Sequence, residues 1–136
     1  MATYNKYTAA IEPLLEAINA GTDAWKVALA ATVNAADTTF TPGTTDLATA
    51  GGYTAGGNAA TVATATQTGG TYKLVLNSPA VWTATGSGFT FRYAILWDST
   101  TSTPVGYWDY GSSQTVAVGE TVTVTLDATN GVFQAT

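Results

Sequence analysis

The chain has no cysteine and no histidine among its 136 residues. The lack of cysteine excludes disulfides, thiolate metal sites and thiol nucleophiles, although it leaves the redox compartment open. The lack of histidine removes the usual general base and the commonest metal ligand. We therefore expect no cofactor and no metal site.

Charged side chains are also scarce, with four basic residues against nine acidic ones. Three lysines and one arginine cannot neutralise a row of phosphates, so a nucleic-acid partner is not expected. No apolar run approaches the ~20 residues that cross a membrane, and the first residues lack a basic segment followed by an apolar core. We expect a protein made in a cytoplasm, with no membrane partner.

Threonine is abundant instead, with 28 residues. Its branched β-carbon favours strands, and short strands separated by turns are predicted from residue 61 onward. A chain of this length is expected to form one domain, residues 1–136, with a core of its own. The predicted fold is mainly β: an antiparallel β-sandwich or barrel with one N-terminal α-helix.

The richest aromatic stretch, residues 88–111, predicts a central hairpin. In its first strand, residues 89–97, every second residue is large and apolar, which places five side chains on one face: Phe89, Phe91, Tyr93, Ile95 and Trp97. A polar turn over residues 98–104 precedes the returning strand, residues 105–110.

The segment 7–20 carries the periodicity of an amphipathic helix. Its apolar stripe consists of Tyr7, Ile11, Leu14, Leu15 and Ile18. Thr8 and Gly21 are the expected caps, and Pro13 requires the helix to begin near Glu12 or to kink there. We interpret the stripe as core and place Glu12 and Glu16 on the solvent side.

The next segments predict a half-buried strand over residues 23–31 and a long flexible loop over residues 32–60. The loop is interpreted either as a free surface loop or as an arm that becomes ordered against a neighbouring subunit. Later predicted strands are residues 61–67 and 71–77 around Gly69-Gly70, residues 80–85, a second hairpin of 114–118 and 121–127, and residues 132–135.

The candidate catalytic groups are scattered acids: Asp23, Asp37, Asp46, Asp98, Asp109, Glu120 and Asp127. Two carboxylates suffice for a glycosidase, but the sequence does not show that any two of them meet. Asp98, Glu120 and Asp127 lie at turns, where such side chains bond local backbone. Asp109 is expected to pair with Arg92 or Lys73 across a sheet. No nucleophile–base arrangement is visible, so no catalytic residue is assigned and no enzyme activity is expected.

Four aromatic residues allow a second interpretation: Trp82, Trp97, Trp108 and Tyr107. Aromatic side chains at alternating strand positions are usually core, but exposed ones stack on sugar rings. A glycan-binding role therefore stays open alongside a purely structural one.

Six segments carry recognisable motifs: residues 4–7, 25–29, 51–58, 91–97, 106–111 and 119–122. With them, nearly the whole chain resembles a family of small virion structural proteins of tailed bacteriophages. The resemblance implies a capsid decoration, or cement, protein on the outer shell of the virion, with no catalytic residues.

Such a protein would bind the major capsid protein and itself, as a homotrimer suited to the local threefold positions of a shell. It would stabilise the shell through many weak contacts that symmetry multiplies. The alternative is a tail- or fibre-associated protein that recognises a host surface glycan.

Overall fold

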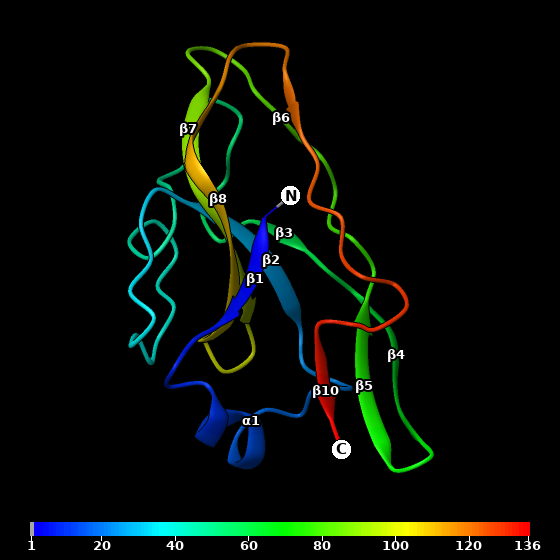
Figure 1. The fold of residues 1–136 in the computed structure, drawn as a ribbon. Coiled ribbons are helices and arrows are strands. Elements are labelled where there is room, and N and C mark those ends of the chain that lie inside the picture. Colours follow the sequence, from blue (N-terminus) through cyan, green and yellow to red (C-terminus); the bar gives the residue numbers. More distant parts are fainter. Residues whose placement is uncertain (1) are drawn as a thin grey trace.

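A computed structural model describes residues 2–136 as an antiparallel β-structure with one short helix (Figure 1). The elements are β1 (Thr3–Lys6), α1 (Ile11–Glu16), β2 (Trp25–Ala30), β3 (Asn58–Ala59), β4 (Val62–Thr68), β5 (Thr71–Leu76), β6 (Trp82–Thr83), β7 (Phe89–Asp98), β8 (Thr103–Val116), β9 (Thr121–Val122) and β10 (Phe133–Ala135).

The strands form three sheets, with the orders β1-β8-β7-β2-β3, β10-β5-β4 and β6-β9. Every pairing is antiparallel. The five-stranded sheet ends at β1 and β3 and does not close on itself, so the fold is sandwich-like rather than a barrel. The predicted fold class is confirmed, including the N-terminal helix.

The main core lies between the five-stranded sheet and the two smaller sheets. It is formed by residues of β2, β5, β7 and β8 and of the segment after β9. Its buried members include Trp25, Leu29, Leu74, Leu76, Trp82, Leu96, Val105, Val122 and Val124. The segment after β9 keeps the alternation of buried valine and exposed threonine that the sequence predicts.

The other face of the five-stranded sheet is buried as well. A second core there contains Tyr7 and Phe40, which cover Ala28, Ile95 and Trp97 of the central strands. The prediction that β2 is half-buried is therefore wrong: apart from Lys26, the whole strand is buried, because layers cover the sheet on both sides.

The single aromatic face predicted for residues 89–97 is also wrong. Phe91 packs in the main core with Leu96, whereas Tyr93 and Trp97 belong to the second core. The register shifts between Phe91 and Tyr93, where β8 carries extra residues. A bulge of this kind reverses which side chains face which way, so the strand changes faces at Arg92.

The second predicted hairpin, residues 114–127, is not formed as two paired strands. Residues 114–116 continue β8 and pair with β7, which makes β8 much longer than the predicted 105–110. The turn at Gly119-Glu120 exists, since the Glu120 amide bonds the Ala117 carbonyl at 2.9 Å. The following strand β9 pairs with β6 instead.

The helix is shorter than the predicted 7–20. Pro13 has no amide to donate and crowds the carbonyl four residues back, so α1 begins at Ile11. Its C-cap is Ala17 rather than Gly21, and Ala10 rather than Thr8 precedes it. At the far end the Asp23 carboxylate accepts the Asn19 amide at 2.9 Å, which supports a turn in place of further helix.

Only part of the predicted apolar stripe packs against the core. Leu14 and Ile18 pack against the core, whereas Ile11 is 45% and Leu15 79% exposed. The expectation that the whole stripe is core is wrong for these two, because a helix this short turns only one row inward. Glu12 and Glu16 are exposed, as predicted.

The segment 32–60 is irregular, as predicted, but it is folded onto its own subunit. Phe40 stacks on Trp97 with ring centroids 4.0 Å apart, and the Trp97 indole donates to the Gly56 carbonyl at 3.0 Å. Neither prediction, of a free loop or of an arm for a neighbour, anticipated this packing.

The same segment covers the edge of β2. β3 pairs with Lys26 and Val27, and beyond it the Leu47 amide bonds the Leu29 carbonyl at 2.9 Å. The Leu29 amide in turn donates to the Tyr53 hydroxyl at 3.0 Å. The edge of the central sheet is thus closed by its own loop.

Candidate functional site

The seven candidate acids are distributed over the molecule, and most hold local structure. Asp127 accepts the Thr129 and Asn130 amides, each at 2.8 Å, and Glu120 accepts the Ala117 amide at 3.1 Å. The prediction that these acids bond turn backbone is confirmed. It also holds for Asp98, which accepts the Thr100 amide at 2.8 Å.

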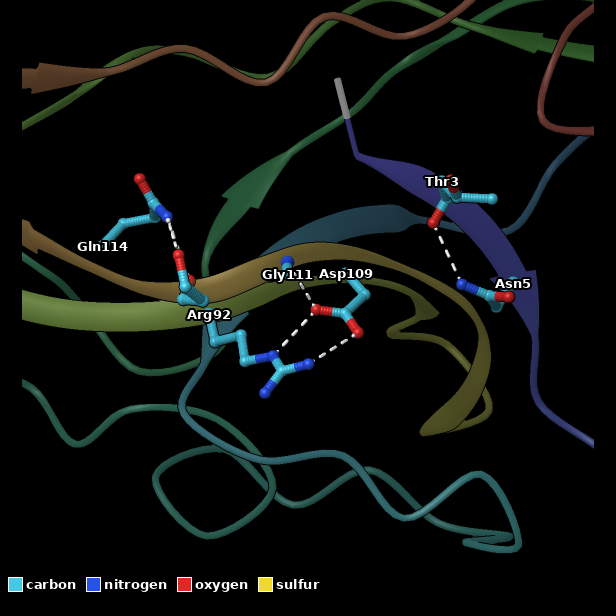
Figure 2. Close-up of polar contacts among 7 residues, drawn as sticks. Thr3, Asn5, Arg92, Asp109, Gly111 and Gln114 are labelled. Carbon is cyan, nitrogen blue, oxygen red and sulfur yellow. Dashed lines mark hydrogen bonds and ion pairs between the residues drawn. The ribbon is translucent and has the colours of Figure 1, made fainter.

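Asp109 pairs with Arg92, one of the two predicted partners. The guanidinium donates to both carboxylate oxygens, at 2.8 and 3.0 Å, and the Gly111 amide adds a third bond (Figure 2). The Arg92 guanidinium lowers the pKa of Asp109 below its usual range. The pair sits where β7 and β8 change register, so its role is to hold the bulge.

Asp46 is the most enclosed carboxylate of the long loop. It accepts the amides of Gly43 and Gly56, each at 2.6 Å, and the hydroxyl of Tyr53. Tyr53 is itself buried, and both its burial and its bond to Asp46 raise its pKa. This cluster joins three parts of the loop to β2 and leaves no carboxylate oxygen free for chemistry.

Asp23 and Asp98 are the pair of acids that the structure brings together. Asp98 is fully buried, and burial raises its pKa; the neighbouring Asp23 carboxyl raises it further, against the lowering effect of Thr100 and Thr101. The pair lies at the Asp98 turn rather than in an open cleft. We interpret it as a structural feature of this turn, in which Asp98 accepts the Thr100 amide.

This pair predicts an unusual pH dependence. Asp98 binds its proton more tightly in the folded than in the unfolded chain, so its contribution to stability falls as pH rises above the ordinary carboxyl range. Asp98→Asn should therefore gain stability relative to wild type between about pH 4 and pH 7. Urea denaturation across that range measures the difference.

Asp109→Asn is the matched control for the pH experiment. The pKa of Asp109 is lowered, so its ionisation stabilises the fold; this contribution is complete above the ordinary carboxyl range and is lost as pH falls below it, so the variant should be less stable than wild type by a constant amount between about pH 4 and pH 7. Parallel pH profiles for the two variants would contradict the assignment of Asp98.

The four candidate aromatic residues lie in different environments. Trp82 and Trp97 are buried, and Tyr107 packs edge-on against Tyr7 with ring centroids 5.5 Å apart. Trp108 alone lines an open groove. Asp127, one of the acids named from the sequence, lines the same groove.

The groove runs between β1, β8 and the segment that follows β9. It has two connected parts of about 440 and 320 Å³ that share Ala2, Trp108 and Thr125. Tyr4 lines one part and Tyr110 the other, and Thr123 adds a hydroxyl. A flat ring flanked by hydroxyl groups suits a sugar better than a charged ligand.

Tyr4 owes its position to the pairing of β1 with β8. It lies opposite Trp108, with ring centroids 4.9 Å apart, and its phenol covers Gly106 so closely that any side chain there would overlap it. Burial raises the pKa of Tyr4. The sequence offered no signal for this contact, because it joins two residues that lie far apart in the chain.

Within residues 2–136 no cluster of three or more acids is arranged to hold a metal ion. No helix in that part of the chain is long and apolar enough to span a membrane. In comparisons with known proteins, no family model, curated protein or solved structure matches the chain.

Proposed function

We propose that the protein is a tailed-phage virion structural protein that decorates the outer head shell and bridges neighbouring major capsid proteins. Three things support this function. Motifs along the chain resemble those of small phage virion proteins, most of the candidate acids bond the protein's own backbone or side chains, and its surface offers contact features rather than a reaction centre. The protein would act without catalysis, at the virion surface, after assembly in the host cytoplasm.

The observation that carries the proposal is the ridge formed by Ile11 and Leu15 on α1. Leu15 stands 79% exposed between two hollows of about 810 and 500 Å³. An exposed leucine between hollows matches the apolar centre of a protein contact, and Glu12 and Glu16 supply a polar rim. We expect this ridge to face the capsid protein.

The test uses heads that lack the protein and the purified protein added back. Heads without it should lose heat and salt resistance, and adding wild-type protein should restore both. Leu15→Asp should fail to bind. Val118→Asp is the control, because Val118 is 66% exposed. It belongs to the turn that follows β8, which lies at the opposite end of the molecule from α1 (Figure 1). Heads equally resistant without the protein would contradict the proposal.

We also propose that the protein assembles as a homotrimer, since a threefold ring fits the local threefold positions of a shell. Sedimentation should then give three times the 13.9 kDa mass of the chain. A species of the chain mass at every concentration would rule this out.

The groove at Trp108 favours a second candidate function, the binding of a host glycan by a tail- or fibre-associated protein. Trp25, Trp82 and Trp97 are all buried, so a sugar in the groove would change the emission of Trp108 alone. Titration with a panel of soluble oligosaccharides should give saturable quenching that Trp108→Phe removes. Silence across the panel would exclude this function.

A further inference from the structure

The open edge of the three-stranded sheet differs from every other sheet edge in the described part of the chain. β4 is the outer strand of the order β10-β5-β4 and has seven residues (Figure 1). The other outer strands, β1, β3, β6, β9 and β10, have two to four residues each. The edge of β2 beyond β3 is covered by the long loop.

The direction of the β4 amides follows from the turn that joins it to β5. Gly69 and Gly70 both have positive φ, 59° and 82°, which defines a two-residue turn of type I′. In such a hairpin the flanking residues, Thr68 and Thr71, exchange hydrogen bonds with each other.

Bonded and non-bonded pairs then alternate along the hairpin. Thr66, opposite Lys73, is bonded to β5, whereas Ala65 and Gln67 direct their backbone amides and carbonyls away from it. None of the hydrogen bonds found within residues 2–136 satisfies these outward groups. They form an open row that a further strand can pair with.

β4 also lacks the features that usually protect an edge. It contains no charged residue and no proline, and its one irregularity lies at its start, between Val62 and Thr64. Residues 64–68 are therefore a regular, uncharged edge. Natural proteins usually block such edges unless they are used.

We propose that β4 pairs with β4 of a second copy of this chain, antiparallel across a twofold axis at Thr66. In this register Thr66 faces Thr66 of the second copy, and Thr64 faces its Thr68. Ala65 and Gln67 exchange the outward backbone bonds. The two three-stranded sheets become one continuous sheet of six strands.

The side chains of this register are compatible with pairing to an identical strand. The face that carries Thr64, Thr66 and Thr68 forms a ladder of threonines, a favourable cross-strand combination. Lys73, opposite Thr66, is the one charged residue of β4 and β5, so the like charges in the paired hairpins are its two copies. They are three strand spacings apart, about 14 Å, which exceeds the screening length of about 8 Å.

The contact is small, because only five residues of each strand pair. Stable dimers commonly bury about 1,600 Å² in total, which this contact does not approach. We therefore expect weak association in solution and strong association where copies are held side by side. The twofold contact uses residues 64–68 of β4 and not the exposed residues Ile11 and Leu15 of the shell-binding ridge.

The experiment places a charge at the twofold axis. Thr66→Lys and Thr66→Glu alone should each lose the association because like charges meet, whereas an equimolar mixture should associate roughly tenfold more tightly than either variant. Thr66 is exposed, so both variants retain the fold, although Thr66→Lys faces Lys73 of its own hairpin and is the less stable of the two, whereas Thr66→Glu pairs with Lys73. Thr44→Lys, on an exposed part of the long loop, is the control and should behave as wild type.

Nuclear magnetic resonance over a concentration series provides the readout. In wild type the amide signals of residues 64–68 should shift with concentration, and the Ala65 and Gln67 amides should become protected from hydrogen exchange. Shifts confined to other surfaces, an unaffected Thr66→Lys variant, or no rescue in the mixture would each overturn the proposal. A failure of shell binding would leave these results unchanged.

Discussion

Replacing Gly57 by alanine should unfold most of the protein. Gly57 has φ of +74°, and a methyl group there would overlap the Val27 carbonyl oxygen and lie 2.6 Å from Ala28 Cα. Both obstacles are backbone atoms of β2, a central strand buried on both faces, so neither can move cheaply. We expect a loss of about 4 kcal/mol or more, measured by urea denaturation.

Gly119→Ala separates the clash from the cost of the backbone conformation. Gly119 has a similar φ of +86°, but nothing lies within 4 Å of the added methyl group. Its replacement should cost only about 1–2 kcal/mol. Equal losses for the two variants would show that the long loop does not press against β2 at Gly57.

Asp46→Ala should produce the second large effect. The substitution removes the acceptor of the Gly43 and Gly56 amides and of the Tyr53 hydroxyl, in a site where Asp46 is only 7% exposed. Each unsatisfied buried donor costs about 1–3 kcal/mol, and the Gly56 amide and the Tyr53 hydroxyl are the two buried donors, so we expect a total loss of about 2–6 kcal/mol. Thermal and urea denaturation measure it.

The control is Asp37→Ala in the same loop. Asp37 bonds the Asn34 side chain at 3.0 Å in an exposed turn, so its loss should cost less than about 1 kcal/mol. Hydrogen exchange adds a local readout, because Asp46→Ala should expose the Leu29 and Leu47 amides at the edge of β2. Unchanged protection of those two amides would contradict the proposed role of Asp46.

Local patterns in the sequence predicted the elements that depend on neighbouring residues. Gly69-Gly70 marks the β4–β5 turn, and the alternation of residues 121–126 gives the correct buried face. Asp98, Glu120 and Asp127 bond turn backbone as predicted, because their partners lie within three residues. These interactions require no knowledge of the rest of the chain.

Two of the wrong predictions concern partners that are distant in the sequence, and a third concerns a local feature of α1. The face change at Arg92 depends on extra residues in β8, and the alternation of residues 89–97 carries no sign of it. The turn at Gly119-Glu120 was found, but a turn does not reveal which strand pairs with the next one. Ile11 and Leu15 are exposed because Pro13 shortens α1.

The candidate groove likewise contains one residue that the sequence identifies and one that it does not. Trp108 was singled out as a candidate sugar platform, one of four such aromatic residues. Its neighbour Tyr4 was not, because the pairing of β1 with β8 joins the start of the chain to its last third. Two side chains that are brought together only by the pairing of distant strands leave no recognisable pattern in either segment of the sequence.

The pairing of Thr3 with Asp109 has a consequence for biosynthesis. Until the ribosome has added Asp109, β1 lacks part of its partner strand, because β8 begins only at Thr103. Closure of the five-stranded sheet must therefore wait until most of the polypeptide has emerged, and pairings this distant form slowly. Copies that are translated close together on one messenger RNA would expose incomplete sheets to one another. This favours release of each chain from the ribosome before the copies assemble.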